Sequence, residues 1–277
     1  MPDLTDGGQT SEVSSDQHFG GVSRLYGDAA VRRLQTSFVA VVGVGGVGSW
    51  ACEALARSGV GRLLLIDPDS IAYSNLNRQL PALQSTVGAS KVATISARIA
   101  DIRSACHVDV IEDALTSENI AQMIPANIDV VIDAIDAPRV KAALIAWCRD
   151  RQIAVIVCGA AGGRDDPLAL HACDLALTTG DALLSKTRAR LRREHGFTRT
   201  PDKKFKVLAV CSTQTPIDSV NSETINSKTI NQQISDNAAA QGAPLNCSGY
   251  GSIVTVTAAM GFAAASKAIQ SLINHTK

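Results

Sequence analysis

The sequence predicts an α/β fold: a Rossmann-like, doubly wound and mainly parallel sheet with helices on both faces. Short runs rich in Val, Ile and Leu alternate along the chain with longer amphipathic segments. The short runs are apolar at nearly every position, which is typical of strands buried on both faces. The first run leads into GVGGVG at residues 43–48, a glycine spacing that joins a strand to a nucleotide-binding helix in folds of this class.

The elements are expected in the following order. The apolar runs predict strands at 38–43, 62–67, 107–113, 128–136 and 153–159. Amphipathic patterns predict helices that begin at 49 and that span 87–102, 116–124 and 137–151.

Two of the expected helices rest on weaker patterns. The helix at 116–124 opens on an imperfect capping pattern, Thr116 to Asn119. Residues 253–265, IVTVTAAMGFAAA, fall short of the roughly 20 residues that a membrane-spanning helix needs. They are therefore expected to form a buried helix, and membrane association is not expected.

Composition sets broad limits on the chain. Of its 277 residues, 45% are hydrophobic, which is enough to form a sizeable core. The formal net charge is zero, so nucleic-acid binding requires a local basic patch. Residues 1–17 are polar, contain acids but no Lys or Arg, and predict a disordered tail before a single domain at 18–277. The seven cysteines include no CxxC pair, which indicates a reducing cytoplasm and argues against a zinc site of paired CxxC type.

The glycine loop is expected to hold a phosphate. Gly43, Gly45 and Gly48 form GxGxxG, which allows a tight turn and close backbone approach to a ligand at the start of a helix. Asp67 closes the next strand and can accept hydrogen bonds from ribose hydroxyls. Together these features predict a nucleotide site rather than an ordinary turn.

The residues after Asp67 favour ATP over NAD. Arg78 and Lys91 suit triphosphate oxygens, Arg as a fork and Lys as a point charge, and NAD needs no such pair. Asp133 and Asp136 lie at the end of the strand 128–136, near the expected ligand crevice. A carboxylate there can hold Mg²⁺, which prefers oxygen ligands and substrate phosphates.

Two segments interrupt the alternation of strands and helices. Residues 181–206 contain nine lysines and arginines against three acidic residues. This basic segment predicts a contact surface for nucleic-acid phosphates, although a solvated helix face would show the same pattern. The residues expected to form this surface are Lys186, Arg188, Arg190, Arg192 and Arg193. Residues 217–245 are rich in Ser, Thr, Asn and Gln and predict a mobile loop.

The motifs resemble those of the ubiquitin-activating-enzyme-like (ThiF/MoeB/HesA) adenylating family. The segments that carry the resemblance are GVGGVGSW, LIDPDSIAYSNLNRQ, VGASKV and VIDAIDAPRVKAALIAWC. FGGVSRLYG at 19–27, CGAAGG at 158–163, CSTQ at 211–214 and CSGYGS at 247–252 are similar to the tRNA threonylcarbamoyladenosine dehydratase branch. The resemblance covers residues 18 to about 272.

This resemblance implies a reaction. ATP would adenylate the carboxylate of threonylcarbamoyladenosine beside the tRNA anticodon, and attack from the same side chain would close a ring and release AMP. It implies ATP and Mg²⁺ as cofactors, modified tRNA as substrate, and a homodimer. The five basic residues named above would then contact the tRNA phosphates. Arg78, Lys91 and Asp136 would be catalytic, with Asp136 as the metal ligand. The residues expected to bind the nucleotide are Gly43, Gly45, Gly46, Gly48, Asp67, Asp69, Asn77, Arg78, Lys91 and Asp133.

Three positions depart from the family pattern or leave a role open. Gly21 stands where the family has an arginine that reaches the partner's phosphates, and Arg24 is a candidate substitute. His18 replaces an arginine of the branch, with unknown effect. A cysteine at the position of Cys211 can bond to a carrier protein in sulfur-handling relatives, but here it ends the run FKVLAVC and a buried position is favoured.

Other functions remain in competition at this point. The main alternative is adenylation of the C-terminus of a ubiquitin-like sulfur carrier, with a sulfur-transfer protein as partner. That enzyme would share the ATP site but bind a protein tail. A non-catalytic tRNA adaptor with a degenerate nucleotide fold, and an NAD oxidoreductase, fit the residues less well.

Overall fold

The computed structural model describes residues 19–201, 203–217 and 250–274. The predicted tail at 1–17, nearly all of the predicted loop at 217–245, and His18 lie outside these residues. The sheet order is β3-β2-β1-β4-β5-β7-β6, and every pairing is parallel except that of β6 with β7. The strands are β1 (Phe38–Val42), β2 (Arg62–Ile66), β3 (His107–Ile111), β4 (Val130–Asp133), β5 (Ala154–Cys158), β6 (Leu170–Asp174) and β7 (Leu208–Ser212).

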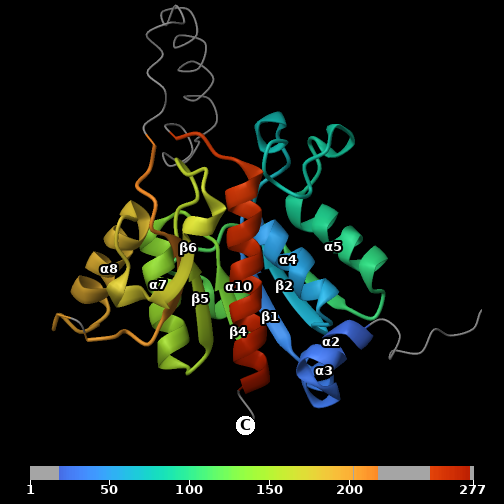
Figure 1. The fold of residues 1–277 in the computed structure, drawn as a ribbon, viewed down its shortest axis with the longest axis horizontal. Helices are drawn as coiled ribbons and strands as arrows, with labels where there is room; N and C mark the ends of the chain where they lie inside the picture. Colours follow the sequence, from blue (N-terminus) through green and yellow to red (C-terminus); the bar gives the residue numbers. More distant parts are fainter. Residues whose placement is uncertain (1–18, 202, 218–249, 275–277) are drawn as a thin grey trace, which may run out of the picture.

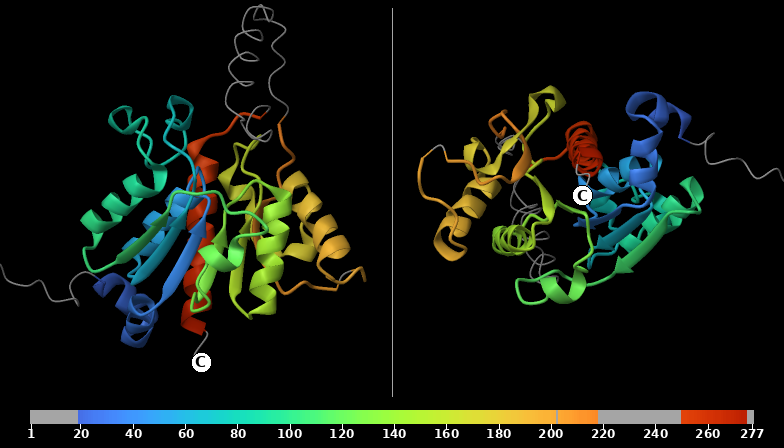
Figure 2. Two further views of the ribbon diagram at one scale, coloured as in Figure 1. Left: turned by 180° about the vertical axis from the view of Figure 1, so that it is seen from behind. Right: turned by 90° about the horizontal axis from the view of Figure 1, so that it is seen from below.

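Helices cover both faces of this sheet (Figures 1 and 2). Alternate strand residues point to opposite faces; Val39 and Val41 pack into one core, while Ala40 and Val42 pack into the other. The predicted doubly wound α/β fold is therefore confirmed. The helices are α2 (Gly20–Tyr26), α3 (Asp28–Gln35), α4 (Gly48–Arg57), α5 (Lys91–Ile102), α6 (Ile120–Met123), α7 (Pro138–Asp150), α8 (Ala182–Glu194) and α10 (Val254–Asn274).

Two predicted elements are less than half as long as expected. The strand predicted at 128–136 ends at Asp133, because Pro138 begins α7 and the residues between form the connecting loop. The helix predicted at 116–124 shrinks to α6. Asn119 accepts a hydrogen bond from the amide of Thr116, so this side chain closes a turn instead of continuing a helix.

Two strands, β6 and β7, were absent from the prediction. β7 contains the apolar run that ends at Cys211, and it lies between β5 and the edge strand β6. β6 is only half-buried, so its sequence lacks the continuous apolar run of the central strands. These two strands extend the sheet beyond β5.

The C-terminal helix α10 is longer than the predicted segment and packs against α4 and the sheet (Figure 1). A Cβ atom on Gly261 would lie 2.4 Å from the Val47 carbonyl oxygen, so glycine is what permits this close approach. By length and composition α10 could cross a membrane, but half of its apolar window is buried inside the fold. This burial agrees with the expected core helix.

Candidate nucleotide-binding site

The carboxyl ends of β1, β2 and β4 meet at one edge of the sheet. Val42 is in register with Ile66 on one side and with Asp133 on the other. The order β2-β1-β4 makes β1 the point where the chain reverses direction across the sheet, and in open α/β sheets this is where ligands bind. The loops that follow these three strands contain the predicted nucleotide-binding residues.

Two glycines are required for the turn after β1. Gly43 has a φ of 85°, and a Cβ atom there would lie 2.8 Å from the Ala134 carbonyl oxygen. A Cβ atom on Gly48 would lie 1.8 Å from the Gly43 carbonyl oxygen. Side chains at either position would therefore push the loop away from β4 or open the turn.

The other two glycines have more space and face the segment that contains Arg78. A Cβ atom on Gly45 would meet only the Gln79 amide, at 3.7 Å. One on Gly46 would lie 3.4 Å from Cγ of Arg78. The backbone at these two positions is thus bordered by long polar side chains, an arrangement suited to phosphate binding at a helix N-terminus.

Asp67 connects the glycine loop to the charged residues behind it. Its carboxylate accepts hydrogen bonds from the amides of Val44, at 2.7 Å, and Asp69, at 2.9 Å. The Lys91 ammonium lies 2.7 Å from the Asp69 carboxylate and 3.8 Å from that of Asp67. Burial raises the pKa of Asp67, and the positive charge of Lys91 opposes this shift. The structure thus brings together three predicted site residues.

The segment around Arg78 is held by backbone contacts, and the Arg78 side chain is half-buried. The Arg78 carbonyl accepts a hydrogen bond from Nε1 of Trp50, at 3.0 Å. The guanidinium donates to the carbonyl of Ser74 and to Oδ1 of Asn77. Asn77 in turn donates to the Ser252 carbonyl, at 2.8 Å, which ties this segment to the start of α10. Arg78 therefore borders the glycine loop, and Asn77 contacts Arg78.

Asp133 and Asp136 occupy different environments. Asp133 is fully buried, and its Oδ1 accepts a 2.7 Å hydrogen bond from the equally buried Lys141 of α7. Burial raises the pKa of Asp133, and the Lys141 ammonium opposes this shift. Asp133 also accepts from the amide of Ile135, so it supports the loop that contains the half-buried Asp136. Of the two carboxylates, Asp136 is the one placed to reach a ligand directly.

The donor set of this loop fits Mg²⁺. Asp136 offers a carboxylate, a hard oxygen ligand, in the loop whose backbone lies against Gly43. Mg²⁺ in nucleotide sites is commonly bound by one or two carboxylates plus phosphates. Oδ2 of Asp133 is buried and has no hydrogen-bond partner within the described part of the chain. It therefore retains acceptor capacity for a cation or for its water.

A second buried charged pair, Arg164 and Asp181, holds the loop CGAAGG that follows β5. Asp181 accepts hydrogen bonds from the amides of Ala160 and Leu184, and Arg164 donates to the carbonyls of Gly162 and Gly180. Arg164 and Asp181 lie 3.8 Å apart and are almost completely buried. These hydrogen bonds thus fix the loop at the carboxyl end of β5.

Cys211 is buried, as expected from its apolar run. Burial raises the pKa of its thiol to about 12, with Cys173 and Asp181 adding to the shift. A buried thiol with a raised pKa is a poor nucleophile. The position therefore does not have the exposed, activated thiolate that covalent bonding to a carrier protein requires.

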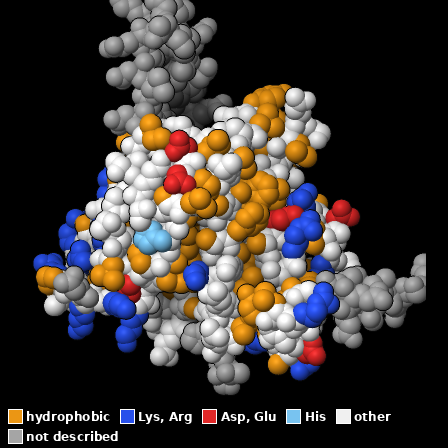
Figure 3. All heavy atoms as spheres, viewed as in Figure 1, with side chains coloured by type: hydrophobic (Ala, Val, Ile, Leu, Met, Phe, Trp, Pro, Cys, Tyr) orange, Lys and Arg blue, Asp and Glu red, His pale blue; other side chains and the backbone are white. Residues whose placement is uncertain are grey.

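The five basic residues expected to contact tRNA lie on α8, but they do not form one surface. Lys186, Arg190 and Arg193 line an open cavity of about 340 Å³ between α8 and the start of α7. Arg188 donates to the hydroxyl of Thr178, and Arg192 stacks over the ring of Phe205. Lys and Arg side chains are concentrated on this flank of the molecule in Figure 3.

The comparisons with known proteins agree with this geometry. The ThiF family model matches residues 21–277. The chain is 41% identical to the tRNA threonylcarbamoyladenosine dehydratase of Haemophilus influenzae, over 93% of this chain and 94% of that protein. The chain belongs to the ThiF family, in its tRNA threonylcarbamoyladenosine dehydratase branch.

Solved structures support the same assignment. A crystal structure of E. coli tRNA N6-threonylcarbamoyladenosine dehydratase, TcdA, in complex with ATP superimposes with a TM-score of 0.79 and 38% identity. The superposition covers 93% of this chain and 94% of that chain. By contrast, the molybdopterin-synthase adenylyltransferase of Haemophilus influenzae is 32% identical over 45% of this chain and 51% of that protein. Similarity to the sulfur-carrier branch is thus confined to part of the fold.

Sequence reasoning missed several residues that build the site. Lys141, Arg164 and Asp181 are buried charges whose partners lie on other elements. The signal for Lys141 was a lone lysine in the otherwise apolar run KAALIAWC. Gln79 is also buried, beside Gly45, and its Oε1 has no hydrogen-bond partner among the described residues.

Proposed function

We propose that this protein is an ATP-dependent enzyme that converts threonylcarbamoyladenosine beside the anticodon of tRNA into a cyclised, dehydrated form. The carboxylate of threonylcarbamoyladenosine would attack the α-phosphorus of ATP, and pyrophosphate would leave. A nucleophile within the same side chain would then attack the acyl carbon, break the acyl–oxygen bond and release AMP. The observation that carries this proposal is that the match to tRNA threonylcarbamoyladenosine dehydratases spans 93% of the chain.

The residues of the site suit this chemistry. Adenylation replaces a poor leaving group, hydroxide, by AMP, so the protein must mainly position two anions and offset their charge. The amides of the glycine loop would bind phosphate, and Lys91 and Arg78 would compensate negative charge on the triphosphate. Asp67 would bind the ribose. Asp136 would hold Mg²⁺, which supplies charge neutralisation at the phosphates when bound.

The proposed reaction predicts when pyrophosphate is released. With ATP and Mg²⁺, release is expected with tRNA that bears threonylcarbamoyladenosine and not with the same tRNA lacking the modification. AMP should form in equal amount, and nucleoside mass spectrometry should show the loss of one water from the modified base. Release that needs a ubiquitin-like carrier protein instead of tRNA would favour the sulfur-carrier alternative.

The cavity between α7 and α8 gives the tRNA proposal a definite surface. Its lining residues Lys186, Arg190 and Arg193 lie next to Pro138, two residues after Asp136 in the chain. Glu194 pairs with both arginines and offsets part of their charge. Phosphates of the anticodon arm bound there would lie close to the adenylation site. Arg188 and Arg192 would contribute less, because they do not line this cavity and instead contact Thr178 and Phe205.

A triple substitution tests this surface. Changing Lys186, Arg190 and Arg193 to alanine is expected to weaken tRNA binding about tenfold or more and to flatten its salt dependence, because fewer counterions are released. Binding should be followed by fluorescence anisotropy at several salt concentrations. ATP affinity should not change. Arg32→Ala, at an exposed position on α3, is the control for general loss of charge; unchanged tRNA affinity and salt slope in the triple variant would move the tRNA surface elsewhere.

We also propose that the protein works as a homodimer. Exposed apolar side chains gather over α10 and α4 in Figure 3, next to the segment that contains Arg78. Tyr73, Ile253 and Phe262 are 72%, 43% and 45% exposed, and a contiguous exposed apolar patch is typical of a protein–protein contact. A second copy would bury this patch and cover the nucleotide site. Arg24 lies on α2, at the opposite edge of the sheet from the glycine loop, so it could serve only the partner's site.

Light scattering should test the dimer. At micromolar concentration the protein is expected to have about twice its chain mass of 29.0 kDa. Phe262→Glu should lower the dimer fraction, because it places a charge in the apolar patch. Leu177→Glu, at a similarly exposed position before α8, should leave the mass unchanged. A monomeric mass for the active wild-type protein would refute the proposal.

A further inference from the structure

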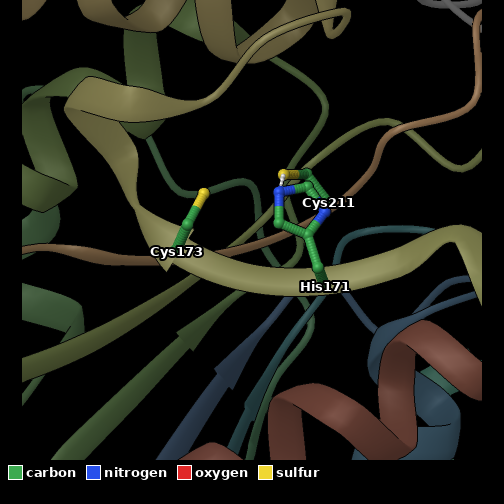
Figure 4. A group of neighbouring side chains, drawn as sticks. All are labelled: His171, Cys173 and Cys211. Carbon is green, nitrogen blue, oxygen red and sulfur yellow. Dashed lines mark hydrogen bonds between the residues drawn. The ribbon is translucent and has the colours of Figure 1, made fainter.

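A cluster of two cysteines and one histidine lies where the edge strand β6 pairs with β7, outside the nucleotide site (Figure 4). His171 is directly opposite Cys211 in the antiparallel register, and Cys173 follows two residues later on the same face of β6. The ligand atoms of all three side chains lie within 4.8 Å of one another. The adenylation chemistry proposed above uses none of them.

The distances fit coordination of a metal ion by nitrogen and sulfur. Zn²⁺ binds thiolate sulfur at about 2.3 Å and imidazole nitrogen at about 2.0–2.1 Å, so a tetrahedral angle separates the two ligand atoms by about 3.6 Å. Nε2 of His171 lies 3.7 Å from Sγ of Cys211. His171 and Cys211 therefore need little movement to bind one ion, and the sulfur of Cys173, within 4.8 Å of both ligand atoms, would move closer by at most about 1 Å.

The imidazole of His171 lacks strong hydrogen-bond partners. Its Nδ1 is buried and has none within residues 19–201, 203–217 and 250–274. Its Nε2 contacts only a thiol, which is a weak donor and acceptor. Metal ligation at Nε2 would replace this weak contact by a strong one, and would leave Nδ1 unchanged. The weak contact at Nε2 therefore favours a ligand at that nitrogen.

A disulfide fits the same residues less well. Cys173 is opposite Ala209, and Cys211 is opposite His171, so the two cysteines are diagonal neighbours. Cα atoms of diagonal neighbours are about 7–8 Å apart, whereas disulfides usually require about 4.4–6.8 Å. Two thiolates would also neutralise a divalent ion, so occupation adds no net charge beside the half-buried Arg188.

We propose that His171, Cys173 and Cys211 bind one thiophilic transition-metal ion of the Zn²⁺ class. The ion links the edge strand β6 to β7, and its fourth coordination position is open to water or another ligand. The site is chemically distinct from that expected at Asp136, because nitrogen and sulfur ligands select Zn²⁺ whereas a carboxylate beside phosphates selects Mg²⁺. The inference does not depend on the tRNA substrate.

Cobalt serves as the spectroscopic probe for this site. Full-length, untagged protein, stripped by chelating resin under reducing conditions, should bind one equivalent of Co²⁺. It should develop the visible bands of tetrahedral cobalt and a thiolate-to-cobalt charge-transfer band. One equivalent of Zn²⁺ should abolish the spectrum, and excess Mg²⁺ should not.

Substitutions of the proposed ligands test whether these residues produce the cobalt spectrum. Cys173→Ser and His171→Ala change half-buried positions and should each lower Co²⁺ affinity about a hundredfold or more. His107→Ala and Cys106→Ser, on and before β3, are the matched controls and should bind as the wild type does. Circular dichroism should confirm that each variant is folded.

Two results would overturn the proposal. One is the absence of tetrahedral cobalt bands in the wild type, or their persistence in Cys173→Ser and His171→Ala. The other is a thiol count under denaturing, non-reducing conditions that is lower by two in the wild type purified without reductant. Mass mapping of that missing pair to Cys173 and Cys211 would identify a disulfide instead of a metal site.

Discussion

Asp136→Ala is expected to lower the rate of pyrophosphate release from ATP about a hundredfold or more while the fold survives. Asp136 lies in the loop between β4 and α7, beside the glycine loop, and is proposed to hold Mg²⁺. Removal of one charge contact to a transition state costs about 3 kcal/mol, or about a hundredfold in rate. The measurement is pyrophosphate release with modified tRNA at several Mg²⁺ concentrations.

The controls separate metal binding from stability. Asp113→Ala changes an exposed carboxylate after β3, at the same edge of the sheet but away from β1 and β4, and should leave the rate unchanged. Asp136→Ala should also raise the Mg²⁺ concentration needed for half-maximal rate. A folded Asp136→Ala protein with near-normal turnover at low Mg²⁺ would reject the assignment of this residue.

Arg78→Ala should cause a loss of similar size, for a different reason. The half-buried Arg78 side chain passes beside Gly46, and its guanidinium is proposed to bind triphosphate oxygens through its planar fork. Its structural contacts with Trp50 and Thr257 are made by its backbone carbonyl, which the substitution retains. The variant should therefore fold normally and yet fail in adenylation.

Arg78→Lys is the matched variant for Arg78→Ala. It keeps the positive charge but loses the two-pronged geometry, so an intermediate rate is expected. Single-turnover measurement of AMP formation, together with thermal unfolding of each variant, distinguishes catalytic loss from misfolding. If Arg78→Ala retains near-wild-type turnover, another cation must neutralise the triphosphate.

The sequence by itself determined the central half of the fold and the composition of the nucleotide site. β1, β2, β4 and β5 are short apolar runs whose burial on both faces is visible residue by residue. The glycines form the turn directly after β1, and Asp67 directly follows β2, the next strand along the chain. Their contact, from the amide of Val44 to the carboxylate of Asp67, follows from adjacent parallel strands that end together.

Only the tertiary structure decided which charged residues on different elements become partners. The buried pair of Lys141 and Asp133 forms because α7 packs on the face of the sheet below β4. The basic residues of α8 are divided between the cavity and the protein interior by how that helix packs.

The tertiary structure likewise determines where His171, Cys173 and Cys211 lie relative to one another. His171 meets Cys211 only because β6 pairs antiparallel with β7 at the edge of the sheet. Local patterns specify which residues are apolar and where turns occur. Strand order and register arise from contacts across the whole core, and no single segment encodes them.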